Sequence, residues 1–419
     1  MSASSSASRV MRDLYALCDC GGRLSGTPGE ALAAAFIMEA GAAAAGVPPI
    51  VHTVDYAGWE PLAARLFMAD GEAVPCHPLV RTVPTPAGGL DAEVIDLGRG
   101  TEEEFEAHRA EIPGRIVLVR HELMFAPGTI HRRVKYERAR AAGAIGFLIS
   151  GPSAGSLVAG SSGREAGEGI PAAGISPETA ARLRRRSGGY PRVRLAIETR
   201  EMPAQTRNIF FDMPGETEEW VVLSAHYDGH SLAESAMDNA SGVAIALETA
   251  RRLRAGGKPA RRGLRLAFFS IEEWALTGSA LYVAGLDEAE RAAIALNVNI
   301  DSVGFDHTLT ALVSGYAALE PFLLGIAERE NIGLRTYRPF QRNSDHANFA
   351  AAGIPAFRLV GGFDDANAPA RHVLTAFDTR DRLDPAHMEK AAGLVTSIVA
   401  AALDAPDEQA RLWRSSRES

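Results

Sequence analysis

The chain has 419 residues, of which 46% are hydrophobic and 23% charged, and its net charge is -9. This length suits more than one domain, and the composition excludes disordered and fibrous proteins. The acidic balance argues against a nucleic-acid surface, and we see no apolar run long enough to span a bilayer. Three cysteines are too few for a disulfide framework, and the N-terminus lacks the apolar core of a secretory signal. We therefore expect a cytoplasmic protein with free thiols.

In chain order, the expected elements describe an α/β domain that is interrupted by an insert. Residues 10–46 are rich in alanine and predict helices, with Pro28 at a helix start, and residues 50–56 predict a strand. From residue 58 to 200, short apolar runs such as 114–121 and 144–150 alternate with Gly-, Ser- and Pro-rich stretches, which is typical of a separate β-rich domain. After residue 207, apolar strands alternate with helices.

This pattern predicts an α/β fold with a mostly parallel central sheet flanked by helices. The domains are expected to be a discontinuous catalytic domain (1–57 and 201–405), a β-rich insert (58–200) and a C-terminal tail (406–419).

Histidine and acidic side chains recur where three of the expected strands end, and two more lie at a helix start and in a late loop. These candidates are His226, Asp228, Asp238, Glu272, Glu273, Asp301 and His372. Taken singly, each has an ordinary explanation as a helix cap, a turn cap, a core histidine or a complement to a helix dipole. Because ligands bind at the carboxyl ends of strands in α/β sheets, and buried ionisable groups are costly unless paired or metal-bound, their recurrence favours a metal site.

The donor types also restrict the metal. Imidazole nitrogen and carboxylate oxygen without thiolate favour zinc, manganese or cobalt over copper(I) or an iron–sulfur cluster. A single catalytic zinc uses three protein ligands and a water, so a larger set suits two ions that share a carboxylate. One acidic residue must stay off the metal to move protons, and Glu272 is the candidate. We therefore expect one or two divalent ions as cofactor, zinc with manganese as the alternative.

Six segments resemble metallopeptidase family 28, the co-catalytic zinc aminopeptidases and their glutamate-carboxypeptidase relatives. Between residues 205 and 400 they are, in order, AHYD, MDNASGVA, FFSIEE, NID, SDHANF and RHVLTAFDT. The resemblance implies Asp238 as the bridging ligand of five, the others being His226, Glu273, Asp301 and His372. It implies Glu272 as the general base and Asp228 as the residue that orients His226. The middle region, with GRIVLVRHE, ERARAAGAIGFLIS and IPAAGIS, resembles the protease-associated insert of many members.

One position departs from the family pattern. Many of these aminopeptidases carry a tyrosine just before the last histidine ligand, whereas this chain has Arg371. A guanidinium there can stabilise developing negative charge or hold a substrate carboxylate, and we expect Arg342 and Asn343 to line the same pocket. The alternative is that Arg371 only pairs with a nearby aspartate, Asp364 or Asp365.

These features together predict a hydrolase that cleaves a C–N bond with a metal-activated water, as a peptidase of aminopeptidase type or a small-amide hydrolase. One alternative is an aminohydrolase that removes the amino group of a small carboxylated aromatic amine, similar to 5-nitroanthranilate aminohydrolase. The other is a non-catalytic, receptor-like binding module, against which the retained ligands and base argue. We expect a peptide or small-molecule substrate, no nucleic-acid or membrane partner, and leave assembly into a homo-oligomer open.

Overall fold

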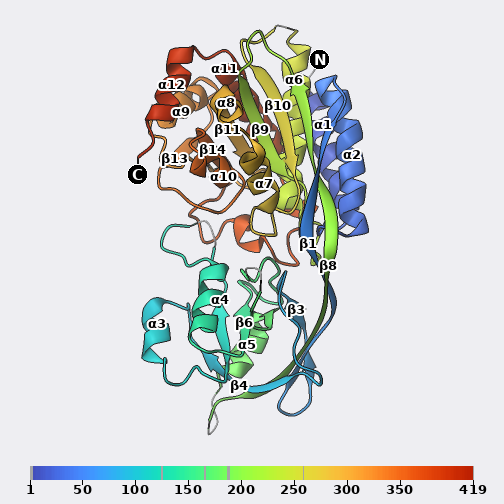
Figure 1. The fold of residues 1–419 in the computed structure, drawn as a ribbon, viewed down its shortest axis with the longest axis vertical. Helices are drawn as coiled ribbons and strands as arrows, with labels where there is room; N and C mark the ends of the chain where they lie inside the picture. Colours follow the sequence, from blue (N-terminus) through green and yellow to red (C-terminus); the bar gives the residue numbers. More distant parts are fainter. Residues whose placement is uncertain (1–2, 124–125, 165–166, 186–188, 258, 419) are drawn as a thin grey trace.

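The computed structural model describes residues 3–123, 126–164, 167–185, 189–257 and 259–418, arranged as two lobes (Figure 1). The upper lobe in Figure 1 holds both termini and most of the helices, and the lower lobe holds the insert. The long strands β1 (Ile50–Met68) and β8 (Arg192–Met213) run through both lobes. The expected domain boundaries near residues 57 and 200 lie within these two strands.

A mixed sheet forms the centre of the upper lobe, in the order β13–β12–β14–β11–β9–β10–β8, with β1 beside β8. Its central strands β14, β11, β9 and β10 are parallel, whereas the β12–β14, β8–β10 and β1–β8 pairs are antiparallel. The strands not yet given are β9 (Trp220–His226), β10 (Gly263–Phe269), β11 (Ile294–Ile300), β12 (Leu309–Leu312), β13 (Leu334–Tyr337) and β14 (Ala356–Gly361). Every residue of β11 and β14 is buried, which explains their unbroken apolar runs.

Helices cover this sheet. Those that pack against one another around α6 are α1 (Ala3–Asp19), α2 (Pro28–Ala45), α6 (Ser241–Ala255) and α11 (Pro385–Leu403). The others are α7 (Thr277–Gly285), α8 (Glu288–Ala293), α9 (Leu319–Arg329), α10 (His346–Ala351) and α12 (Asp407–Ser415), with short turns η1 (Ala236–Ala240), η2 (Pro369–His372) and η3 (Arg380–Arg382). Pro28 begins α2 as predicted, after the capping residue Thr27.

The segment expected to be a C-terminal tail contains helix α12. Its Trp413 is fully buried, and the ring lies 4.7 Å from that of Phe322 in α9, centroid to centroid. One large aromatic side chain therefore anchors a helix that is otherwise polar. None of the helices described here combines the length and the apolar character that crossing a bilayer requires.

The insert is a smaller α/β unit with its own buried clusters. Its strands are β2 (Ala73–Val74), β3 (Cys76–Pro78), β4 (Leu90–Asp96), β5 (Ile116–Arg120), β6 (Gly146–Ser150) and β7 (Ala172–Ile175). Its helices are α3 (Glu102–Ala107), α4 (Arg132–Ala141) and α5 (Pro177–Leu183). Strands β5 and β6 lie where the sequence predicts strands, and they pair in parallel.

Candidate active site

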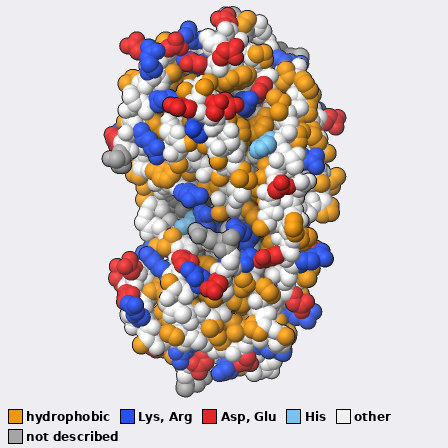
Figure 2. Space-filling model, in the orientation of Figure 1, with side chains coloured by type: hydrophobic (Ala, Val, Ile, Leu, Met, Phe, Trp, Pro, Cys, Tyr) orange, Lys and Arg blue, Asp and Glu red, His pale blue; other side chains and the backbone are white. Residues whose placement is uncertain are grey.

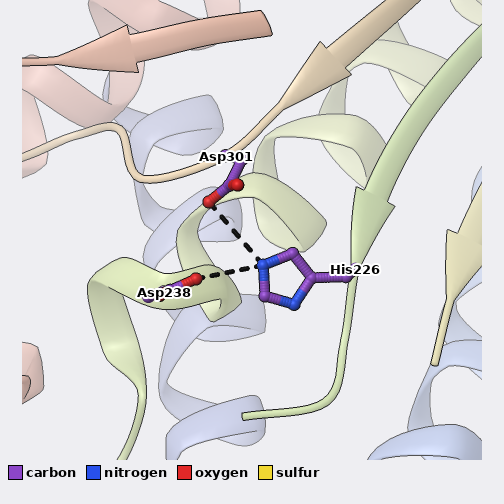
Figure 3. Close-up of side chains that lie close together, drawn as sticks. All are labelled: His226, Asp238 and Asp301. Atoms are coloured by element: carbon purple, nitrogen blue, oxygen red, sulfur yellow. Dashed lines mark ion pairs between the residues drawn. The ribbon is translucent and has the colours of Figure 1, made fainter. Parts of the chain in front are cut away.

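Three predicted metal ligands converge at the carboxyl ends of two neighbouring parallel strands. His226 is the last residue of β9, Asp301 follows β11, and Asp238 lies in the turn η1 after β9. Nε2 of His226 lies 3.0 Å from Oδ1 of Asp238 and 3.6 Å from Oδ1 of Asp301 (Figure 3). In the described part of the chain, these three buried residues are the one group of three or more His, Cys, Asp or Glu whose ligand atoms all lie within 4.8 Å of one another.

These atoms do not satisfy one another by hydrogen bonding. Although Nε2 of His226 is close to Asp238, the pair lacks hydrogen-bond geometry, and this nitrogen is buried with no hydrogen-bond partner among the described residues. Oε1 of Glu273 is orphaned in the same way. Each such atom costs about 1–3 kcal/mol unless it meets a partner. Imidazole and carboxylate donors that face a common point, rather than each other, fit a divalent cation such as zinc.

The position of Asp238 rules out the helix-cap explanation. Helix α6 starts at Ser241 and its N-terminal cap is Ala240, while Asp238 has φ −118° and ψ 83°, which is not helical. Asp378 instead holds the turn: its carboxylate accepts the backbone N–H groups of Met237 at 2.6 Å and Asp238 at 3.2 Å. Burial, together with the negative charge of Asp238, raises the pKa of Asp378 to about 7.

Asp228 connects the histidine to the two glutamates. Its Oδ1 lies 3.6 Å from Nδ1 of His226, and its two oxygens accept the N–H groups of Glu272 at 3.1 Å and Glu273 at 3.2 Å. The hydroxyl of Ser25 donates to it as well, at 3.2 Å. Asp228 is fully buried, and these three hydrogen bonds hold its carboxylate in one orientation. This placement suits the orienting role that the sequence predicts for it.

Glu272 and Glu273 lie in the loop between β10 and α7 and line one small cavity with Asp238 and Asp301. Burial raises the pKa of both glutamates well above the ordinary value, and neighbouring carboxylates raise it further. Carboxyl groups crowded in this way keep protons at neutral pH unless a cation lies among them. The cavity therefore concentrates acidic groups around a point where a cation is favoured.

Arg358 of β14 is a site residue that the sequence reasoning missed. Its guanidinium is 1% exposed and places Nη2 3.1 Å from Oδ2 of Asp301. Burial alone would raise the pKa of Asp301. The positive charge of Arg358 and the contact with His226 nevertheless hold this pKa below its ordinary value. The sequence does hold a signal for this residue, since Arg358 is the one charged residue of the apolar run AFRLVG. An arginine in a buried strand needs an acidic partner, so this position indicates a buried ion pair.

A second missed residue, Arg132, comes from the insert. It begins α4, is 4% exposed, and lines the same cavity as the glutamates. Burial lowers its pKa to about 10, against the opposing effect of Glu273 and Asp238. No sequence signal connects Arg132 to the site, because the segment RRVKYERARA around it has the composition of a polar surface helix.

His372 is not among the residues whose ligand atoms lie within 4.8 Å of one another, and its ring contacts Arg371 and the insert instead. Nδ1 of His372 is 3.5 Å from Oγ of Ser153 in the insert, and its Nε2 accepts a hydrogen bond from Nε of Arg371 at 3.3 Å. Asp364 pairs with Arg335 instead of Arg371. Arg371 therefore contacts the predicted ligand itself.

The two remaining predicted substrate-binding residues face hollows of the surface. Asn343 lines the small cavity, and Arg342 lines a groove that adjoins it. Both lie in the loop before α10, as their position before the SDH segment implies.

Comparison with known proteins agrees with this geometry. Residues 208–399 match peptidase family M28, and residues 77–183 match the PA domain. The chain is 26% identical to aminopeptidase YwaD of Bacillus subtilis, over 76% of this chain and 68% of the relative. It is also 26% identical to the probable lipoprotein aminopeptidase LpqL of Mycobacterium tuberculosis, over 83% of this chain and 73% of the relative.

Solved structures show the same fold. BSAP, a zinc aminopeptidase from Bacillus subtilis, superposes with a TM-score of 0.76 at 24% identity and covers 95% of each chain. A peptidase M28 precursor from Shewanella amazonensis gives 0.78 at 20% identity and covers 96% of each chain. The expected zinc aminopeptidase-like fold with an inserted protease-associated domain is thus confirmed. The chain is a metal-dependent hydrolase whose residues 208–399 match peptidase family M28 and whose inserted domain, residues 77–183, matches the PA domain.

Proposed function

We propose that this protein is an aminopeptidase that uses two zinc ions, with Glu272 as its general base. The observation that carries the proposal is the convergence of His226, Asp238 and Asp301 beside a cavity lined by Glu272 and Glu273. The names of the relatives, which are aminopeptidases, support this substrate class. They do not favour an amine-removing aminohydrolase or a non-catalytic receptor.

His226, Asp238 and Asp301 would hold one ion. Asp238 and Glu273 would hold the other, together with His372 once its ring turns away from Ser153 and Arg371. The bound metal supplies Lewis acidity, which polarises the scissile carbonyl and lowers the pKa of water at the site.

The protein side chains then divide the remaining work. Glu272 takes the proton from the attacking water and returns it to the departing nitrogen. Asp228 keeps the imidazole of His226 in orientation through its backbone carbonyl oxygen, 3.2 Å from Nδ1, with its carboxylate 3.6 Å away. Arg358 occupies one oxygen of Asp301, so that the other faces His226.

Location and partners are proposed on narrower grounds. Cys18, Cys20 and Cys76 are all free thiols, which supports a reducing, cytoplasmic location. A peptide or small-molecule substrate without nucleic-acid or membrane partners remains a prediction, as does self-association.

Hydrolysis of leucyl and alanyl arylamides by the zinc-loaded protein tests the proposal. Glu272→Gln should keep its zinc, measured by mass spectrometry, while turnover falls by about 10²–10⁴-fold. Glu106→Gln, which changes an exposed glutamate of the insert that lines neither the cavity nor the groove, is the matched control. Loss of zinc from Glu272→Gln would mean that the roles of the two glutamates are exchanged. Absence of arylamide hydrolysis in the zinc-loaded wild type would refute the aminopeptidase proposal.

A further inference from the structure

The small cavity at the acidic residues opens toward a larger groove between the two lobes. The cavity has a volume of roughly 50 Å³ and the groove roughly 780 Å³, and Arg133 and Ala275 line both. Figure 2 shows basic side chains gathered at the waist between the lobes, where the surface is hollowed. A substrate that reaches the metal ligands along the groove passes this basic region.

Two arginines at this passage come from opposite lobes. Arg133 is the second residue of α4 in the insert, and Arg342 lies in the loop before α10 in the upper lobe. Nη2 of Arg133 contacts the carbonyl oxygen of Arg342 at 3.4 Å, so the two residues meet across the groove. Burial lowers the pKa of Arg133, and so does the charge of Arg342, whereas Glu272 opposes this.

In the part of the chain that the structure describes, neither guanidinium forms a close ion pair, although the charge of Glu272 acts on Arg133. Among the described residues, no carboxylate lies within 4.0 Å of Arg133 or Arg342. Other arginines of the groove are paired: Arg140 with Glu137 at 2.6 Å, and Arg164 with Glu201. Two unpaired cations held beside each other repel, and an anion placed between them relieves that repulsion.

The position of Glu272 indicates which part of the substrate meets these arginines. As general base, Glu272 returns a proton to the departing nitrogen, so the leaving group lies on the side of Glu272. Arg133 lines the cavity with Glu272 and continues into the groove. The leaving group therefore extends toward Arg133 and Arg342.

We propose that Arg133 and Arg342 bind a carboxylate on the leaving-group side of the scissile bond, which makes the enzyme selective for short peptides with a nearby C-terminal carboxylate, dipeptides above all. This inference rests on the proposed peptidase function. Guanidinium groups suit the task because they bind a carboxylate through paired, charge-assisted hydrogen bonds. One arginine comes from each lobe, so selectivity depends on the insert being in place.

A pair of substrates that differ only in the carboxylate tests the site: leucyl-glycine and leucyl-glycine amide. The zinc-loaded wild type should cleave the free acid with a kcat/KM at least about tenfold higher than the amide. Arg133→Gln and Arg342→Gln should each reduce this ratio toward one, chiefly through a higher KM for the free acid. Arg140→Gln, an arginine of the same groove that is already paired, should keep the wild-type ratio.

Leucyl p-nitroanilide, which has no carboxylate, separates the two proposals. A wild type that cleaves it but treats the dipeptide and the amide alike refutes the carboxylate site and leaves the aminopeptidase proposal intact. If none of the three substrates is cleaved, the proposed function fails. The carboxylate site is then tested by the affinities of leucyl-glycine and leucyl-glycine amide for zinc-loaded Glu272→Gln. Tighter binding of the dipeptide than of the amide supports the site, and equal affinity or no binding overturns it. Arg342 is exposed, so its variant keeps the test valid if Arg133→Gln does not fold.

Discussion

Replacing Arg358 with methionine removes the buried cation that pairs with Asp301. The two side chains are 1% and 3% exposed and lie 3.1 Å apart, so solvent does not screen their attraction. Removing one partner of a buried pair costs about 3–5 kcal/mol, because the remaining charge stays buried without its main counter-ion. The variant also loses the hydrogen bond from Nη1 to the carbonyl oxygen of Asn343, at 2.7 Å. The free energy of unfolding of the metal-free protein should therefore fall by about 3–5 kcal/mol.

The affinity for zinc should rise in Arg358→Met, although the stability of the metal-free protein falls. Arg358 places a positive charge beside a predicted metal ligand, so its removal leaves Asp301 with more negative charge for the ion to meet. Zinc affinity should rise, and each tenfold gain in affinity adds about 1.4 kcal/mol to the stabilisation by excess zinc. Zinc should thus recover part of the stability that the substitution removes.

Urea unfolding of EDTA-treated and zinc-saturated protein measures both effects. The matched control is Arg335→Met, which removes the exposed pair with Asp364 and should cost at most about 1 kcal/mol in either state. The reasoning is refuted if metal-free Arg358→Met is as stable as the wild type, or if zinc stabilises the variant less than it stabilises the wild type.

Three further predictions address other parts of the molecule. His372→Ala should bind one zinc fewer per chain by mass spectrometry, and an unchanged metal count would remove His372 from the ligand set. Burial lowers the pKa of His230 to about 3, below its unfolded value, so its stabilising effect is present at neutral pH and is lost as the pH falls through this range. The loss should reach roughly 4 kcal/mol near pH 3, and His230→Gln should flatten the dependence of unfolding free energy on pH between 6.5 and 3; an unchanged slope would contradict this. Burial raises the pKa of Cys18 to about 12, so its thiol should react with a disulfide reagent at pH 8 at least a hundredfold more slowly in the folded than in the unfolded protein, and comparable rates would show that it is accessible.

The sequence was informative wherever local pattern decides structure. Strands β9, β10 and β11 are largely apolar runs that end at, or within three residues of, His226, Glu272 and Asp301, so both the strands and the edge where these side chains gather could be predicted. His226 and Asp301 meet because β9 and β11 are adjacent and parallel, which the strand pattern already favours. The orienting role of Asp228 was implied by the family resemblance, and the contact itself is local because Asp228 lies two residues after His226.

Contacts between distant segments could not be predicted in this way. Arg132 and Arg133 belong to a helix whose pattern is that of a polar surface, and only the packing of one lobe against the other brings them to the glutamates. A motif can also name His372 without giving the direction of its ring. In the structure that ring faces Ser153 and Arg371, because the insert packs against the loop that holds it.

The connection between the lobes explains how an insert can supply groups to the site with the accuracy that binding needs. Strands β1 and β8 pair without a break in the chain from Ile50–Phe210 in the upper lobe to Met68–Val193 in the lower lobe, with one bulge. A second connection follows His372 directly: Val158 of the insert forms a β-bridge with Thr375, and the N–H of Ala159 donates to the carbonyl oxygen of Leu374 at 2.8 Å. Two attachments far apart in sequence resist rotation of the insert far better than one hinge does. Arg133 can therefore face Glu272 in a fixed position, as selective binding requires.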